Sequence, residues 1–329
     1  MSTVEHNNRC VLCGKPKEDG RKIIVGLHGA VCSECVILCS EIMRTGGEDV
    51  SSSSPRGRNI IERMLGIASE ISPPSPSGPV LDRLVAMARE LGRPELGQVI
   101  LAEGNVSGRD GETLWIKASG HQMASIGPEG FVQVDLDRVV SSLGADDWSD
   151  QDCRRFLNES RTDPTGGFPS TETFMHAWLL ALPDVGFVAH THPTATLGVM
   201  CGPLAAEFAE CRYFPDQVVL CGPRSVLVPY VAPGLALAKA IRDACTRFTG
   251  ETGWRPKTVL LENHGLIALG KTPNEAIAAC LMTEKAAKVF VAAGEPRPLT
   301  DDEVAHIHNW TDEHFRQGKI WSDWTGDHF

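Results

Sequence analysis

Long apolar segments are missing from this 329-residue sequence, and so is any surplus of positive charge. No apolar run approaches the roughly 18 residues that a membrane-spanning helix needs, and we find no signal peptide. The 31 lysines and arginines stand against 42 aspartates and glutamates, a formal net charge of -11. This balance argues against a general binder of nucleic acid or of anionic membranes. An anionic substrate would need local positive charge from a metal ion or a helix start.

The sequence also lacks internal repeats and the GxxxxGK motif, so no ATPase domain is expected. Its 11 cysteines include several that stand singly in apolar runs, which is typical of the reducing cytosol rather than of a disulfide scaffold. We therefore expect a cytoplasmic protein. A composition of 42% hydrophobic and 22% charged residues is that of an ordinary globular protein. The length exceeds one average domain and predicts two.

Four of the cysteines form two CxxC pairs, Cys10 with Cys13 and Cys32 with Cys35, and 18 residues separate the pairs. This spacing predicts a tetrahedral zinc site made of four thiolates. Such a site would replace the hydrophobic core that about 40 residues could hardly supply. A redox or disulfide pair is the less favoured alternative.

The segment around these cysteines contains RCVLCGKPKEDGRKIIVG and then VCSECVILCSEIM. It resembles the zinc-binding domain at the start of the ClpX unfoldase over residues 8–45, which implies a small treble-clef-like zinc finger. In that family the module dimerises and holds adaptors or substrates, so we expect dimerisation or recruitment of a protein partner. We predict this domain at 1–45, a flexible linker with a short helix at 46–79, and a second domain at 80–329.

The second domain centres on the stretch from 168 to 193. The apolar run 185–189 predicts a short buried strand. His190 and His192 follow it, and side chains two residues apart in a strand point to the same side. They can thus direct two imidazoles at one divalent metal ion. Two polar residues at a strand end remain an equal alternative.

A second strand is predicted over 258–261, and His264 follows it, with Gly265 allowing a tight turn. Three histidines with an open fourth position form the catalytic type of zinc site. Upstream, Pro169 precedes a predicted helix with Ser170 as N-cap and Glu172 in the first turn. Glu172 would then stand beside both a metal and an anion pocket, although an ordinary capped helix would show the same pattern.

Five motifs occur in the order found in one family: GNVSGR at 104–109, KASG at 117–120, PSTE at 169–172, HTHP at 190–193 and NHGL at 263–266. Together they resemble the class II aldolase/adducin family over roughly residues 80–295. The segment KASGHQMAS, and PSTET followed by His176, look closest to the aldolase portions of sugar-phosphate aldolase/dehydrogenase fusions. The resemblance implies an α/β fold with a central, mainly antiparallel sheet flanked by helices, usually in a fourfold-symmetric tetramer.

The resemblance also implies a role for individual residues. Small amide, hydroxyl and backbone donors can surround a phosphate without charge. In the family, the positions that match this set hold the substrate phosphate: Asn105, Ser119, Gly120, Ser170 and Thr171. Tyr213 lies where such aldolases carry a tyrosine that reaches a neighbouring subunit's active site. Tyr230 competes for that role, and a half-buried core tyrosine is an equal alternative.

We therefore predict a carbon–carbon lyase that cleaves a ketose phosphate to dihydroxyacetone phosphate and an aldehyde. Zinc or another divalent cation on the three histidines would act as a Lewis acid, and Glu172 would be the acid/base. Lys117 is expected at the substrate rim or in solvent. A sugar-phosphate dehydratase, epimerase or decarboxylase of the same fold is an alternative, although the epimerase branch resembles PSSD, with aspartate in place of Glu172. From another class, an adducin-like binding scaffold is also possible.

Further elements are expected along the second domain. Helices are predicted over 81–93, 233–248 and 273–293, the last opened by a capping box at 272–275. Strands are predicted over 114–117 and 131–136, and a turn over 108–111. The polar, Gly-rich stretch 143–167 predicts a loop. The tail from 300 is expected to pack at a subunit edge or to close the site.

Overall fold

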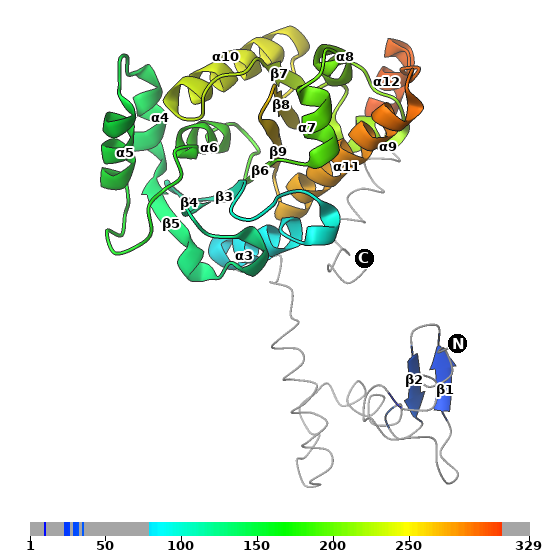
Figure 1. Cartoon of the computed structure of the whole chain (residues 1–329), viewed down its shortest axis with the longest axis horizontal. Coiled ribbons are helices and arrows are strands. Elements are labelled where there is room, and N and C mark those ends of the chain that lie inside the picture. The colour runs from blue at the N-terminus through cyan, green and yellow to red at the C-terminus, as the bar shows by residue number, and fades with distance from the viewer. Residues whose placement is uncertain (1–9, 11–22, 27–28, 33–34, 36–78, 311–329) are drawn as a thin grey trace. The chain divides into compact units, whose positions relative to one another are not determined.

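A computed structural model describes residues 10, 23–26, 29–32, 35 and 79–310 of the chain (Figure 1). The chain separates into two compact units, Met1–Pro73 and Pro74–Phe329. The short helix expected within the linker 46–79 and the tail from 311 lie outside the described residues, and the domain limits given above stay a prediction. In the part that is described, no helix combines the length and apolar character needed to cross a bilayer.

The N-terminal unit contains a small antiparallel hairpin of β1 (Ile23–Gly26) and β2 (Gly29–Cys32). Cys10, Cys32 and Cys35 are buried together, with their sulfur atoms within 4.8 Å of one another. The backbone N–H of Cys32 donates to Cys10 Sγ at 3.3 Å. A backbone N–H that donates to a sulfur atom stabilises the thiolate form, as a cluster of thiolates requires. Cys13, the fourth predicted ligand, lies outside the described residues.

A seven-stranded sheet forms the centre of the second unit, in the order β5-β4-β3-β6-β9-β8-β7 (Figure 1). Its pairs are antiparallel except for β7 with β8, which is parallel. The strands are β3 (Asn105–Asp110), β4 (Thr113–Lys117), β5 (Phe131–Asp135), β6 (Phe187–Thr191), β7 (Val226–Val228), β8 (Thr258–Leu261) and β9 (Gly265–Gly270). The predicted fold, a mainly antiparallel sheet flanked by helices, is confirmed.

Helices cover both faces of this sheet, because successive strand side chains point to opposite sides. Val188 of β6 packs into one hydrophobic cluster with α4, α5, α6 and α10, and Ala189 packs into the other with α3, α7, α8 and α11. The α-helices are α3 (Val80–Leu91), α4 (Leu136–Ser141), α5 (Asp150–Glu159), α6 (Thr173–Leu180), α7 (Thr194–Met200), α8 (Ala205–Glu210), α9 (Pro215–Cys221), α10 (Leu235–Thr252), α11 (Pro273–Ala293) and α12 (Asp301–His308). The 3-10 turns are η2 (Pro94–Leu96), η3 (Met123–Ser125), η4 (Pro128–Gly130) and η5 (Ser142–Gly144).

The prediction of a loop over 143–167 is wrong for its central part, which forms α5. Ser149 accepts a hydrogen bond from the Asp152 N–H, and the Asp152 carboxylate accepts one from the Ser149 N–H, so the two make a capping box. The buried residues Cys153 and Leu157 lie four apart and share one face of the helix. Only these two positions of α5 are buried, so the apolar periodicity is too sparse to reveal the helix in the sequence.

The turn predicted over 108–111 is shorter than expected. Gly108, Arg109 and Asp110 pair with β4, and the chain reverses at Gly111, whose φ is 62°. Gly108 is required by packing, since a Cβ there would lie 2.9 Å from the Phe187 ring and from Val80. Glycine is thus needed at position 108 because neighbouring side chains lie close, and at position 111 because the backbone is left-handed.

Candidate active site

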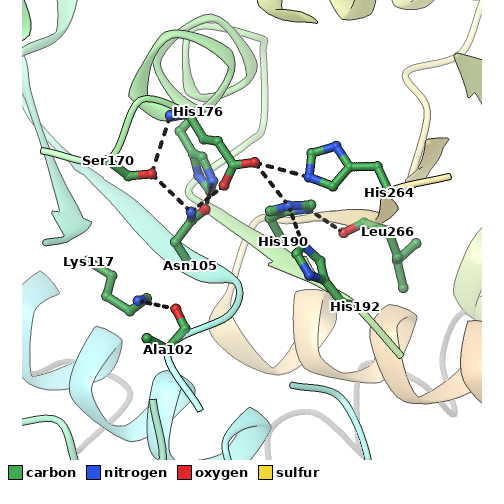
Figure 2. A network of polar contacts seen from close by, with 10 residues as sticks. Ala102, Asn105, Lys117, Ser170, His176, His190, His192, His264 and Leu266 are labelled. Carbon is green, nitrogen blue, oxygen red and sulfur yellow. Dashed lines mark hydrogen bonds and ion pairs between the residues drawn. The ribbon is translucent and has the colours of Figure 1, made fainter. Parts of the chain in front are cut away.

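Three histidine rings meet at one end of the central strands. His190 is on β6, His192 follows it, and His264 lies in the turn between β8 and β9. Their ring centroids are 4.8, 4.9 and 5.2 Å apart, and one nitrogen from each lies within 4.8 Å of the others. His190 and His192 face each other through their Nε2 atoms at 3.0 Å (Figure 2).

The sheet register explains this convergence. Strand β6 pairs with β9, with Thr191 opposite Leu266, so the turn that carries His264 lies beside the end of β6. Asn263 in that turn is the residue with a left-handed backbone, with a φ of 54°. The expectation that Gly265 would supply the tight turn is therefore wrong. Gly265 lies in β9, where a Cβ would be 2.5 Å from Thr191 O and 2.9 Å from His192 Cδ2.

Gly265→Ala is expected to lower the free energy of unfolding by about 1–3 kcal/mol, as overpacking of a close contact does. The nearest clash is with backbone, and relief would move His192, so metal binding should weaken as well. Urea unfolding measures the first effect, and metal content the second. Gly250→Ala is the control: Gly250 is in α10 with open space at its Cβ, so alanine should be neutral or stabilise by up to about 1 kcal/mol. Equal free energies of unfolding for the two variants would contradict the close contact of position 265 with Thr191 and His192.

Glu172 stands between the histidines and β3. Its Oε1 lies 3.3 Å from His190 Nε2 and 3.2 Å from His264 Nε2, and its Oε2 accepts a 2.6 Å hydrogen bond from Asn105 Nδ2. The residue is also the N-cap of α6, without a side-chain cap bond. The prediction of Ser170 as the N-cap is wrong, since the helix begins at Thr173. The Ser170 hydroxyl instead accepts from the Glu172 N–H at 3.3 Å.

The electrostatic surroundings favour the ionised form of Glu172 and the neutral form of the His192 ring. Burial tends to raise the pKa of Glu172, but the charge of His190 and hydrogen bonds from its neighbours outweigh it, so the pKa lies well below its ordinary value. Burial and the other two rings lower the pKa of His192 to about 3. For His190, burial lowers the pKa and Glu172 raises it, with a net direction upward.

These residues fit a divalent metal ion. His190 Nδ1 donates to Leu266 O at 3.0 Å, which leaves the Nε2 lone pair free to bind a metal once that nitrogen has lost its proton. Two imidazole nitrogens 3.0 Å apart need either a proton or a cation between them. The set of three nitrogens with a carboxylate close by is suited to zinc and to similar divalent ions. Binding at these three residues stays a proposal.

Small polar groups lie on the other side of Glu172. Asn105 Nδ2 is 3.4 Å from Ser170 Oγ, and the Ser119 N–H donates to Phe168 O at 3.0 Å. The loop with Ser119 and Gly120 therefore lies against the segment that precedes α6. Ser119 and Gly120 are exposed, with open space where a Cβ of Gly120 would be. Thr171, the remaining predicted phosphate ligand, is exposed as well.

The family follows from a direct comparison. A family model for the class II aldolase and adducin N-terminal domain matches residues 82–291, more than half of the chain. The chain belongs to this family. A second model, for the ClpX C4-type zinc finger, matches residues 8–45. Both resemblances predicted from the motifs are confirmed, and the chain joins an aldolase-family domain to a zinc-finger segment.

Individual relatives are distant. "Uncharacterized oxidoreductase YuxG" of Bacillus subtilis is 31% identical over 170 residues, which is 52% of this chain but only 22% of the relative's length. The 5-methylthioribulose-1-phosphate/5-deoxyribulose-1-phosphate aldolase of Rhodospirillum rubrum is 29% identical over 207 residues, 62% of this chain and 79% of that protein. The N-terminal class II aldolase domain of a conserved Thermoplasma acidophilum protein is similar in structure, with a TM-score of 0.51 and 26% identity, covering 64% of this chain and 93% of that one.

Lys117 of the aldolase-family domain is not at a rim or in solvent, so that expectation is wrong. The residue is only 3% exposed, and its Nζ donates to His121 O at 2.7 Å. It also donates to Ala102 O at 3.2 Å (Figure 2). Burial lowers its pKa, and the charge of Glu172 opposes this. Lys117 thus ties the loop before Asn105 to the loop that begins after β4.

The two tyrosines have other surroundings. The Tyr213 hydroxyl donates to Glu207 Oε1 at 3.4 Å, and its ring packs against Phe290 at 5.3 Å. Burial raises the pKa of Tyr213. These contacts are with α8 and α11 rather than with the histidines. Tyr230 is 60% exposed. A role for Tyr213 in a neighbouring subunit's site stays a prediction.

One residue of the site was given no role by the sequence. His176 of α6 is fully buried, with Nδ1 2.6 Å from Ser107 Oγ and Nε2 in hydrogen-bond contact with Asn105 Oδ1. Its position four residues after Glu172 places the two on the same side of α6, and that spacing was the available signal.

Proposed function

We propose that the aldolase-family domain catalyses metal-dependent retro-aldol cleavage of a ketose phosphate to dihydroxyacetone phosphate and an aldehyde. The observation that carries this proposal is the convergence of His190, His192 and His264 on the Glu172 carboxylate, beside the small polar groups around Asn105. A binding scaffold of the adducin type has no need of this arrangement. The relative from Rhodospirillum rubrum carries the name of an aldolase for ribulose-type phosphates, which favours this class of substrate.

The residues divide the chemistry among them. Asn105, Ser170 and Thr171, with Ser119 and Gly120, hold the substrate phosphate through amide, hydroxyl and backbone donors. The three histidines would hold Zn²⁺ or another divalent cation, which would supply Lewis-acid charge to the oxygens of the substrate.

Glu172 acts as the acid/base. When the carbon–carbon bond breaks, the hydroxyl of the aldehyde fragment loses a proton, and the carbon of the dihydroxyacetone phosphate fragment gains one. Glu172 moves the proton at that carbon, and its hydrogen bond from Asn105 Nδ2 holds the carboxylate in place. With only 12% of its side chain exposed, the carboxylate works in a setting that largely excludes water.

A panel of pentulose and hexulose 1-phosphates, including 5-methylthioribulose 1-phosphate, tests the proposal. Dihydroxyacetone phosphate is detected through NADH oxidation by an added glycerol-phosphate dehydrogenase. Its release from at least one substrate supports cleavage. Loss of water without this product would point to a dehydratase, an isomeric ketose phosphate to an epimerase, and carbon dioxide from a 3-oxo acid phosphate to a decarboxylase. An inert protein that binds metal would contradict an enzyme of any of these types.

We further propose that the finger binds zinc through Cys10, Cys13, Cys32 and Cys35 and serves as a dimerisation or partner-recruitment module on a cytoplasmic homotetramer. An oligomer would carry several fingers, and their simultaneous binding would raise the overall affinity for a partner that each finger binds weakly. The buried cluster of three cysteines supports the zinc site. The chain without residues 1–58 should cleave substrate at an unchanged rate but lose partners or change its number of subunits in sedimentation. Unchanged partners and an unchanged number of subunits would exclude this role.

A further inference from the structure

We propose that His176 is a positioning residue that fixes the orientation of the Asn105 amide and, through that amide, of the Glu172 carboxylate. The inference deepens the proposed function and rests on it for its kinetic consequence. Ser107, His176, Asn105 and Glu172 form one continuous line of polar contacts that ends on the histidines. Figure 2 shows the part of this line from His176 through Asn105 to the histidines. Its members come from β3, the loop that leads into α6, and α6 itself.

The backbone sets up this line. Asn105 and Ser107 are two apart on β3, so their side chains point to the same side of the sheet, the side on which α6 lies. Glu172 and His176 are one helical turn apart and face β3 together. Strand β3 also pairs with β6, with Asn105 opposite His190. The same strand therefore holds Asn105 against His176, Glu172 and the metal-binding end of β6.

The chemistry of each partner determines the direction of every hydrogen bond. Asn105 presents its NH₂ group to Glu172 Oε2 at 2.6 Å, and the carboxylate oxygen accepts. The Asn105 Oδ1 atom then faces His176. An amide oxygen can only accept, so His176 carries its proton on Nε2. Burial lowers the pKa of His176 to about 3, and the neutral ring accepts at Nδ1 from the Ser107 hydroxyl.

The Nε2 proton of His176 and the Glu172 carboxylate select the same orientation of the Asn105 amide. An asparagine amide can rotate by half a turn and exchange its oxygen with its nitrogen. The exchange would set Asn105 Oδ1 against Glu172 Oε2 at the 2.6 Å now spanned by a hydrogen bond, with two acceptors facing each other. The Nε2–H of His176 stabilises only the orientation in which Asn105 Oδ1 faces His176 and the NH₂ group faces Glu172. Because all the donors point toward the carboxylate, the bonds also strengthen one another.

A buried histidine that only fills space would have different consequences. Loss of packing lowers the fraction of active protein, so kcat would fall with stability while KM stays constant. Loss of positioning affects two proposed roles at once, the acid/base role of Glu172 and the phosphate binding by Asn105. It lowers kcat through Glu172 and raises KM through the phosphate contact of Asn105. The two roles therefore separate in the kinetic constants.

Histidine ¹⁵N NMR of the full chain and steady-state kinetics together test the proposal. The ring of His176 should carry its proton on Nε2 at neutral pH, assigned by the loss of its signals in His176→Gln. His176→Leu should lower kcat/KM by about 10–100-fold, as loss of an outer-shell partner does, with changes in both constants. His176→Gln keeps an N–H donor toward Asn105 and should recover most of this loss, although both variants lose stability.

Three results would overturn the inference: an Nδ1–H tautomer, a protonated His176 ring at neutral pH, or an unchanged KM with losses of kcat that follow stability equally in both variants. His306→Gln, on the exposed side of α12, is the control and should leave both constants unchanged. The NMR result does not depend on any reaction. If the ketose phosphate panel yields no product, the proposed function fails, while the tautomer still decides whether His176 orients Asn105.

Discussion

Glu172→Gln is expected to lower the kcat for ketose phosphate cleavage by about a hundredfold to ten-thousandfold, the usual contribution of a positioned acid/base. Glutamine keeps the size of the side chain and can still contact Asn105 and His264, but it cannot take up and return a proton at the substrate carbon. KM should change little, because the groups proposed to hold the phosphate remain. Rates are measured from released dihydroxyacetone phosphate.

The matched control for this change is Glu159→Gln. Glu159 ends α5, is 56% exposed, and pairs with Arg138 at 3.3 Å, so its loss should leave kcat within experimental error. Metal content should be equal in wild type and Glu172→Gln, since the three histidines are retained. A Glu172→Gln variant that cleaves at more than a third of the wild-type rate would remove Glu172 from the mechanism.

The second large effect concerns the metal ions. Wild-type protein is expected to hold two per chain, one at the cysteines and one at the histidines. His192→Ala removes one of three nitrogen ligands, so its affinity for the second ion should fall by more than the 10–100-fold typical of losing an outer-shell partner. Cleavage should be lost with the ion. Metal per chain is measured by mass spectrometry after desalting, alongside the rate.

Two variants complete this experiment. Cys35→Ser should lose the finger's ion and keep both the second ion and cleavage, since the finger is proposed to take no part in the chemistry. His306→Ala should keep both ions, because its ring stacks on Trp310 at 5.9 Å and lies on a different element from the three histidines. One ion per wild-type chain, or an unchanged count in His192→Ala, would refute the histidine site.

Local patterns were sufficient for much of the fold. The strands at β4, β5, β6 and β8 and the long helices α3, α10 and α11 lie close to where apolar periodicity and caps predicted them. Helix α5 was missed because its core contact consists of Cys153 and Leu157 within a polar stretch. Lys117 was misplaced because a lysine followed by Ala-Ser-Gly resembles an exposed strand end, whereas its actual partners are carbonyls of Ala102 and His121.

By itself, the sequence determined the pieces of this protein: the two CxxC pairs, the paired histidines after a buried strand, and the acid at the start of a helix. Each of these depends on residues a few positions apart, where strand and helix periods place side chains. Only the tertiary structure decided which pieces meet. The pairing of β6 with both β3 and β9 brings Asn105 and His264 to His190, and the packing of α6 on β3 closes the line from Ser107 to Glu172. Such contacts depend on strand order and register, which local spacing does not encode.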